Sequence, residues 1–152
     1  MSVDVVKKLI EKKISISFAE SITGGLLSKL VTDVPGSSSI LSESFVVYSN
    51  EAKVKIIGVD KKLIVKYGVV SSEVAKDMAT KLKIKTNSDL CISTTGNAGP
   101  TICDDKPVGR VYVGILYIDN INVYELNLNG DRSDIRNKTC EFIFNKIDEL
   151  IR

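Results

Sequence analysis

The segment Ile14–Val34, with the sequence ISISFAESITGGLLSKLVTDV, points to the class of fold that this chain adopts. Apolar and polar residues alternate over its first six positions, as they do in a half-buried β-strand. Gly24 and Gly25 interrupt that pattern, and the apolar residues after them recur at the spacing of an amphipathic helix, which Pro35 ends. The segment therefore predicts a strand, a turn and a helix, with Thr23 as the cap of the helix.

The rest of the chain repeats this alternation. A first helix is predicted from Ser2, as its N-cap, to about Lys13, and a helical face introduced by Ser71 fades after Leu82. Further strands are predicted at residues 44–48, 89–94, 111–118 and 123–128, and further helices at residues 51–57 and from residue 135 onward. The turn Asp119-Asn120 between the last two strands is typical of a hairpin. We therefore expect one domain over residues 1–152, with an α/β fold in three α/β/α layers and a mixed, mostly parallel sheet of about five strands that includes a late antiparallel hairpin.

The composition excludes several classes of function. The 21 Lys and Arg residues nearly balance the 19 Asp and Glu residues, which argues against a nucleic-acid partner. No apolar run is long enough to span a bilayer and the chain does not open with a signal peptide, so no membrane partner is expected. There is no histidine, and the three cysteines form no CxxC pair. We therefore expect neither a metal nor a disulfide framework, and a reduced cytoplasmic setting.

Polar residues gather where the predicted strands end. In open α/β sheets the loops that leave the carboxyl ends of the strands form the ligand crevice. Three such loops, Glu20–Gly25, Tyr48–Lys53 and Thr94–Pro100, are rich in glycine and small hydroxyl residues. In the first loop, backbone N–H groups and the helix dipole would suit an anion or a developing oxyanion, although a plain structural turn explains the two glycines equally well.

Lys53 breaks a local rule. If Asn50 caps the short helix, Lys53 occupies its third position, where the helix dipole disfavours a cation. A helix N-terminus and partial burial both lower the pKa of an ammonium group, and a neutral lysine can act as a general base. Ser21, at the neighbouring strand end, would then be the nucleophile. Considered alone, Lys53 is more simply interpreted as a solvated surface lysine.

Two arginines and three cysteines complete the set of candidate residues. Arg132 and Arg136 are four residues apart and share one helical face, so they could clamp a phosphate or carboxylate, although such a pair is commonly a surface feature. Cys91 and Cys140 are predicted to be inert core residues, whereas Cys103 is predicted to lie in an exposed loop.

Eight short motifs follow one another along the chain: Ala19–Gly25 (AESITGG), Asp33–Ser38 (DVPGSS), Tyr48–Lys53 (YSNEAK), Ile57–Val59 (IGV), Tyr67–Ser71 (YGVVS), Thr95–Pro100 (TGNAGP), Lys106–Gly109 (KPVG) and Gly130–Arg132 (GDR). Their order resembles that of the CinA C-terminal domain family of competence- and damage-inducible proteins. Stand-alone members of that family are similar to nicotinamide-nucleotide amidohydrolase. The resemblance implies that the chain deamidates nicotinamide mononucleotide to nicotinate mononucleotide and ammonia, and we expect no cofactor for this reaction.

The resemblance also implies roles for individual residues. It places Ser21 and Lys53 at the reacting amide with Tyr48 beside them. It implies further contacts from hydroxyl groups, backbone N–H groups and phosphate-binding arginines, namely Thr23, Gly24, Gly25, Ser49, Asn50, Thr95, Gly96, Arg132 and Arg136. The nucleophile is open among Ser21, Thr23 and Ser49, and Ser21 is favoured because Ile22 stands where the family usually has Cys or Thr.

Two departures from the family pattern motivate other functions. Asn97 replaces an apolar residue, and Thr101–Asp105 replaces a glycine-rich stretch. The alternatives are a non-catalytic nucleotide-binding protein linked to competence or DNA damage, and an amidase for a different small amide. We also expect a homodimer, because a site built from loops at one sheet edge often borrows residues from a second copy.

Overall fold

The computed structural model describes all residues, Met1–Arg152, and contains a five-stranded sheet in the order β2-β1-β3-β4-β5. The strands are β1 (Ile16–Glu20), β2 (Phe45–Val46), β3 (Leu90–Gly96), β4 (Arg110–Tyr117) and β5 (Asn120–Asn127). β1 pairs in parallel with β2 and β3, whereas β4 is antiparallel to β3 and β5. Four strands therefore share one direction and β4 opposes them, which confirms the mixed sheet and its late hairpin.

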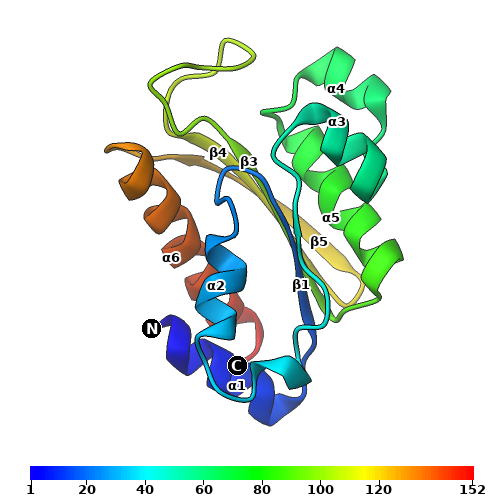
Figure 1. Cartoon of the computed structure of the whole chain (residues 1–152), viewed down its shortest axis with the longest axis vertical. Coiled ribbons are helices and arrows are strands. Elements are labelled where there is room, and N and C mark those ends of the chain that lie inside the picture. The colour runs from blue at the N-terminus through cyan, green and yellow to red at the C-terminus, as the bar shows by residue number, and fades with distance from the viewer.

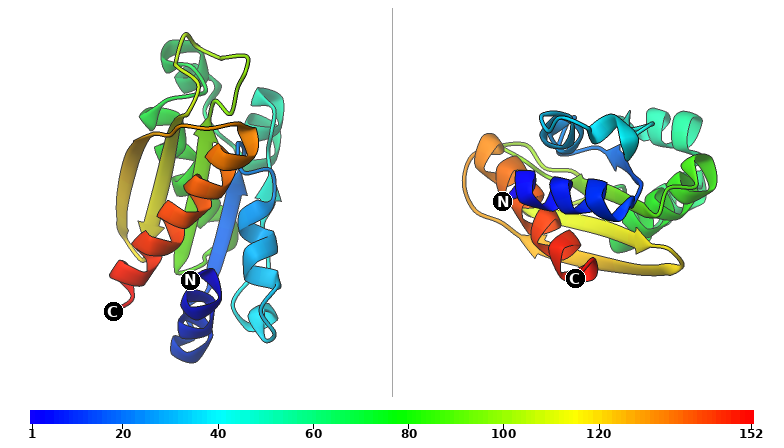
Figure 2. Two further views of the ribbon diagram at one scale, coloured as in Figure 1. Left: turned by 90° about the vertical axis from the view of Figure 1, so that its left-hand side faces the viewer. Right: turned by 90° about the horizontal axis from the view of Figure 1, so that it is seen from below.

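Helices cover both faces of the sheet (Figure 1). One face carries α1 (Ser2–Lys12), α2 (Leu26–Thr32) and α6 (Arg132–Leu150), which contact one another. The other face carries α3 (Asn50–Ala52), the π-helical turn Lys53–Ile57, α4 (Lys61–Tyr67) and α5 (Ser72–Thr86). A short 3-10 turn, Ser37–Ser39, lies near α1, and Figure 2 shows the three layers from two further sides. The predicted α/β/α arrangement is confirmed. None of the helices has the length and apolar character needed to cross a bilayer.

Strand β1, which lies between β2 and β3, is buried on both faces, not on one as its alternating sequence predicts. All five of its residues are buried. Phe18 packs into the core under α1, α2 and α6, whereas Ala19 packs into the smaller core under α5. Ser17 is also fully buried, and its hydroxyl forms a hydrogen bond of 2.9 Å with Thr86 Oγ1. The polar positions of the strand are therefore satisfied inside the protein and do not face water.

Several element ends differ from the sequence prediction. Ser2 lies inside α1, whose N-cap is Met1, and β2 is only two residues long. The last contact of this strand with β1 is the hydrogen bond that Val47 N–H donates to Glu20 O at 2.8 Å, after which the chain continues to α3. The sequence prediction also lacked α4, which begins after Asp60, whose carboxylate accepts from Lys62 N–H at 2.9 Å.

The strand directions bring the functional loops to one edge of the sheet. The carboxyl ends of β1, β2 and β3 lie there because these strands are parallel to one another. β5 runs in the same direction, since it is antiparallel to β4, and it leads into the first turn of α6. Loops from four parts of the chain therefore meet at this edge, as the rule for open α/β sheets requires.

Candidate active site

A cavity of about 270 Å³ opens at this edge. The residues lining it that the sequence pointed to are Ser21, Tyr48, Asn50, Lys53, Thr95, Gly96 and Arg132. The remaining lining residues are Ile22, Val69, Val70, Asn97, Ala98, Gly99, Thr101 and Cys103. Five residues of the predicted site do not line it, namely Thr23, Gly24, Gly25, Ser49 and Arg136. The cavity thus brings together the proposed nucleophile, the proposed base and one of the two arginines.

Lys53 is buried at the bottom of this site, so its interpretation as a solvated lysine is wrong. Its side chain is only 1% exposed, and Nζ donates to Ser21 Oγ at 2.9 Å, to Val47 O at 3.0 Å and to Tyr48 O at 3.3 Å. No carboxylate lies within ion-pair distance. Burial lowers the pKa of Lys53 from its ordinary 10.5 to about 8, and an attraction to Cys103 acts in the opposite direction.

The three acceptors around Lys53 match the three hydrogens of an ammonium group, and the same arrangement can also serve the neutral amine. A neutral amine has two hydrogens and one lone pair, and the two backbone carbonyls of Val47 and Tyr48 accept two hydrogens. The lone pair can then accept the hydroxyl hydrogen of Ser21 over the same 2.9 Å. In its neutral form Lys53 would therefore direct its basic electron pair at a serine oxygen, as a general base requires.

Of the two causes expected to lower the pKa of Lys53, a helix N-terminus and burial, the structure supports burial. Ser49, not Asn50, is the N-cap of α3, because Ser49 Oγ accepts from Ala52 N–H at 3.0 Å. Lys53 is therefore the fourth helical residue and begins the π-helical turn. Burial is the main cause that lowers the pKa of Lys53.

Of the three candidate nucleophiles, only Ser21 lies beside Lys53. Ser21 is 7% exposed, and its N–H donates to Thr94 Oγ1 at 3.1 Å. Thr23 is fully buried and forms a hydrogen bond with the same Thr94 hydroxyl, also at 3.1 Å. Ser49 is exposed and serves as the helix cap. The structure therefore separates the three hydroxyl groups into one at the base, one in the core and one at a helix end.

The N-terminus of α2 is occupied by the protein's own carboxylate. Glu20, the last residue of β1, is fully buried and accepts from Leu27 N–H at 2.9 Å and from Ser28 N–H at 3.1 Å. Ser28 Oγ also donates to this carboxylate, at 2.6 Å. The prediction that Thr23 caps this helix is wrong, because the N-cap is Gly25. An oxyanion cannot use these helix N–H groups, because they already donate to Glu20. The N–H groups of Ile22 and Thr23 donate to no acceptor within the chain, so they are the free donors nearest to Ser21.

Thr95 is buried in the wall of the cavity, and its hydroxyl hydrogen is already committed. Oγ1 donates to Val69 O at 2.8 Å. The resemblance implied a hydroxyl donor here, whereas this contact leaves the lone pairs of Thr95 Oγ1 as acceptors for a ligand. Gly96 follows it, and a Cβ there would lie 2.7 Å from Arg110 O, so the strand can continue only with glycine at this position.

The two arginines share a helical face as predicted, but they make different contacts. Arg132 is exposed, donates from Nη1 to Gly99 O and donates from Nη2 to Tyr48 Oη at 3.1 Å. It thereby bridges the loops that follow β2 and β3 at the mouth of the cavity. Arg136 is half-buried and donates from Nη2 to Thr23 O at 3.0 Å, outside the cavity.

Asn97 organises the loop after β3. Its Nδ2 donates to Cys103 O and Lys106 O, both at 3.1 Å, and its Oδ1 accepts from Cys103 N–H at 3.0 Å. Asp104 in the same loop accepts from Val70 N–H at 2.9 Å. The residues that depart from the family pattern therefore hold the loop together and close it against the segment before α5.

Sequence reasoning placed Glu20 and Thr94 at the start of two candidate loops but gave neither residue a role. Glu20 is buried at the end of β1, and Thr94 is buried within β3. A signal was present for Glu20, since an acidic residue that ends an otherwise apolar strand needs a buried partner, and the following helix supplies N–H groups. Thr94 carried no such signal, because threonine is common in strands.

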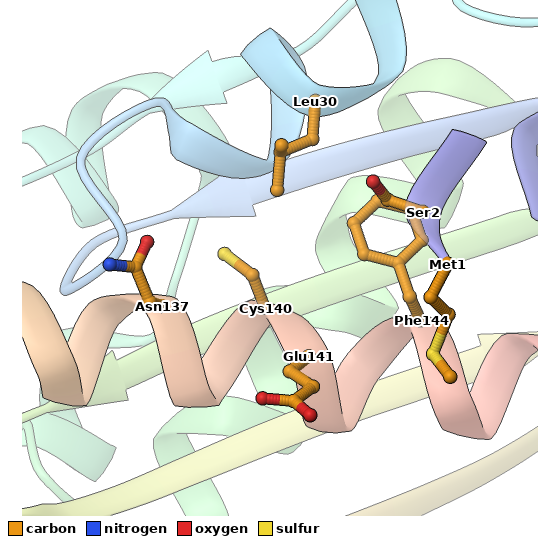
Figure 3. A pocket seen from close by; sticks show the side chains of 7 residues that line it. All are labelled: Met1, Ser2, Leu30, Asn137, Cys140, Glu141 and Phe144. Atoms are coloured by element: carbon orange, nitrogen blue, oxygen red, sulfur yellow. The ribbon is translucent and has the colours of Figure 1, made fainter.

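A second cavity of about 220 Å³ lies away from this edge, between the start of α1, α2 and α6. Figure 3 shows Cys140 and Leu30 pointing toward one another across it. Burial raises the pKa of Cys140 to about 12, with Glu20 raising it further and Arg136 lowering it. Cys140 and Cys91 are buried and Cys103 is exposed, which confirms their predicted placement. No group of three or more Cys, Asp or Glu side chains could hold a metal ion.

The fold and the site define a class: an α/β domain with a buried serine–lysine pair at the carboxyl edge of a mixed sheet. The family model for the CinA C-terminal domain matches residues 1–151, so the chain belongs to that family. The chain is 49% identical over 138 residues to a protein of Thermoanaerobacter pseudethanolicus whose name refers to competence-damage induction, covering 90% of this chain and 33% of that protein. It is 41% identical over 145 residues to a CinA-like protein of Petrotoga mobilis, covering 95% of this chain and 36% of that protein.

Solved structures share the fold. A CinA superfamily protein from Klebsiella pneumoniae superposes with a TM-score of 0.94 at 23% identity, covering 99% of this chain and 94% of that one. A competence/damage inducible protein from Agrobacterium tumefaciens gives a TM-score of 0.93 at 28% identity, covering 99% and 93%. The chain spans about a third of the length of the curated relatives that it matches.

Proposed function

We propose that this chain is an amidohydrolase that converts nicotinamide mononucleotide to nicotinate mononucleotide and ammonia. The observation that carries the proposal is the 2.9 Å contact between Lys53 Nζ and Ser21 Oγ, together with a pKa of Lys53 lowered to about 8. A hydroxyl next to a lysine that can be neutral near pH 7 is an activated nucleophile without histidine. The substrate comes from the family resemblance and not from the geometry.

In the first half of the reaction, Ser21 Oγ attacks the carboxamide carbon. Lys53 Nζ takes the hydroxyl proton and becomes an ammonium group. The carbon–nitrogen bond then breaks, and Lys53 returns that proton to the departing nitrogen, which leaves as ammonia. The product of this half is an ester between Ser21 and the nicotinoyl group, and Lys53 is neutral again.

In the second half, a water molecule replaces ammonia beside Lys53. Lys53 takes a proton from the water as its oxygen attacks the ester carbon. The bond to Ser21 Oγ breaks, and Lys53 protonates the serine oxygen. Nicotinate mononucleotide leaves, and both side chains return to their starting states.

Three further groups would assist this reaction. The free N–H group of Ile22, which lines the cavity, is the candidate donor to the oxyanion, and such a donor typically contributes about 3 to 4 kcal/mol. Thr95 Oγ1 would accept a hydrogen from the amide nitrogen, because its own hydrogen is donated to Val69 O. Arg132, at the mouth, would exchange its contact with Tyr48 for the phosphate of the nucleotide.

The test is ammonia release from nicotinamide mononucleotide, with nicotinate mononucleotide identified by chromatography, in the presence and absence of a chelator. We expect turnover that a chelator does not change and that Ser21→Ala abolishes. Ammonia release by Ser21→Ala at the wild-type rate would eliminate the mechanism. Ammonia release from a panel of small amides shows whether nicotinamide mononucleotide or a different amide is the preferred substrate.

A nucleotide-binding role without turnover, linked to competence or DNA damage, is the second candidate, and the names of the relatives, which refer to competence and damage, support that link. Calorimetric binding of nicotinamide mononucleotide without any product would support that role. The proposal also includes a cytoplasmic homodimer, and light scattering of the purified chain measures the oligomeric state.

A further inference from the structure

The two arginines of α6 lie one helical turn apart, yet only one of them reaches the cavity. Arg132 is exposed at the mouth, where it contacts Tyr48 and Gly99. Arg136 instead donates to Thr23 O at 3.0 Å, behind the turn that carries Ser21. A ligand anion at the mouth would therefore meet Arg132 and not Arg136.

The guanidinium group of Arg136 is packed directly on Gly24. A Cβ at Gly24 would lie 2.5 Å from Arg136 Nη2 and 3.3 Å from Cζ, so any other residue at position 24 would displace this group. Arg136 Nε is buried and has no hydrogen-bond partner. Gly24 also has a φ of +58°, a conformation that glycine adopts without strain. The turn and the arginine are thus fitted to each other, at the cost of one unpaired N–H group.

The same turn is held from its inner side. Ser21 N–H donates to Thr94 Oγ1, and the carboxylate of Glu20 accepts from Leu27 and Ser28 of α2. α6 runs beside α2 on this face of the sheet (Figure 1). The short segment between Glu20 and α2 is therefore fixed by a strand, by its own helix and by Arg136.

We propose that Arg136 is a positioning residue for Ser21 and not a ligand for the substrate. The inference rests on the proposed function in taking Ser21 as the nucleophile. Arg136 holds the carbonyl of Thr23 against α6, which keeps Ser21 Oγ at 2.9 Å from Lys53 Nζ. Without that contact the turn can relax, and a shift of about 1 Å at a reacting atom can cost on the order of 10²-fold in rate.

Steady-state kinetics with nicotinamide mononucleotide test this division of roles. For Arg136→Met we expect kcat to fall on the order of 10²-fold while KM stays within about threefold, and for Arg132→Met we expect KM to rise. Arg136→Lys should recover part of kcat, because an ammonium group can also donate to Thr23 O. A rise in KM for Arg136→Met with kcat unchanged, or no change in either, would overturn the inference.

The matched control is Lys138→Met. Lys138 lies on the same helix, and its Nζ also donates to a backbone carbonyl, that of Asn129, at 2.6 Å. It is exposed and does not line the cavity, so the variant loses the same kind of contact without touching the Ser21 turn. We expect its kcat and KM to equal those of the wild type.

A fluorophosphonate probe gives a readout that does not depend on the substrate. Ser21 Oγ displaces fluoride from phosphorus and Lys53 takes the proton, and mass spectrometry measures the labelling rate. Slower labelling of Arg136→Met supports the inference, and labelling at the wild-type rate overturns it. If the wild type labels at Ser21 but releases no ammonia, the proposed function fails while the role of Arg136 is still decided. Should Arg136→Met not fold, Gly24→Ala is read in the same way, since its Cβ displaces the guanidinium group.

Discussion

Two ionisable side chains are buried near the carboxyl edge of the sheet, Glu20 as the last residue of β1 and Lys53 in the π-helical turn that follows β2 and α3, and their surroundings are opposite in kind. Glu20 is fully buried and receives three hydrogen bonds from α2, two of them from backbone N–H groups at the positive end of the helix dipole. Lys53 is 1% exposed and meets one hydroxyl and two backbone carbonyls, none of which carries a charge.

This difference separates a structural group from a reactive one. A buried charge that is surrounded by oriented donors is compensated in its ionised form, so Glu20 serves to fix the start of α2. A buried cation without a counterion is compensated only in part, and its pKa falls, here to about 8.

The largest expected effect is the loss of turnover in Lys53→Met. General acid–base catalysis typically contributes between 10² and 10⁴, so we expect kcat/KM for ammonia release to fall roughly 10³-fold, or about 4 kcal/mol. The control is Lys55→Met, which removes an exposed lysine from the same π-helical turn. Equal activity of the two variants would show that burial beside Ser21 confers no special role.

The next effect is on stability and its dependence on pH. The pKa of Lys53 is about 8 in the folded protein and 10.5 when it is unperturbed, so the unfolded chain binds more protons between these values. The free energy of unfolding of the wild type should therefore rise with pH through this window, relative to Lys53→Met, by about 2 to 3 kcal/mol between about pH 7.5 and pH 10.

Urea denaturation of both proteins across this range measures the difference, and the subtraction removes contributions from tyrosines and other lysines. Lys55→Met should follow the wild type at every pH, since its amine is exposed. A constant difference between wild type and Lys53→Met would mean that Lys53 has the same pKa in both states.

The pH dependence of catalysis depends on the same pKa of Lys53, and we expect a smaller effect on it than on stability. Because the neutral amine is the active form, kcat/KM should rise about 50-fold from about pH 6 to pH 8 and then level off near the pKa of Lys53. Cys103 raises that pKa, so Cys103→Ser should move the midpoint of the curve to lower pH. A profile that is flat, or that falls as pH rises, contradicts a lysine base.

The sequence predicted the fold and the pair formed by Ser21 and Lys53 better than it predicted the tertiary contacts that hold them in place. Alternating patterns and strand-end glycines were enough for the α/β/α layers, and a chain without histidine left Ser21 and Lys53 as the simplest pair. The pattern could not show that Ile16–Ala19 would be covered on both sides, because burial of the second face depends on α5, more than 50 residues away in the chain.

Spacing was also insufficient to separate the two arginines. A four-residue interval predicts that Arg132 and Arg136 lie on one helical face, and this prediction is confirmed. Which loop each guanidinium reaches depends on the position of α6 along the sheet, so the expectation of a shared phosphate clamp could not distinguish a contact with Tyr48 from one with Thr23. Tertiary contacts, not local pattern, decide this.

The smallest expected effect concerns the other member of the pair. Glu20→Gln keeps the shape of the side chain but turns one oxygen into an NH₂ group, which faces N–H donors of α2 instead of accepting from them. An unsatisfied buried polar group costs about 1 to 3 kcal/mol, so we expect a loss of about 2 kcal/mol in the free energy of unfolding.

Asp60→Asn is the matched control, because Asp60 caps α4 with an exposed carboxylate. Asparagine is nearly as good an N-cap as aspartate, so this substitution removes the charge but keeps the cap. Urea denaturation should therefore show a clear loss for Glu20→Gln and a change within about 0.5 kcal/mol for Asp60→Asn. Equal losses would mean that the burial of Glu20 adds nothing to ordinary capping, and the contrast between the two buried groups would then reduce to Lys53 alone.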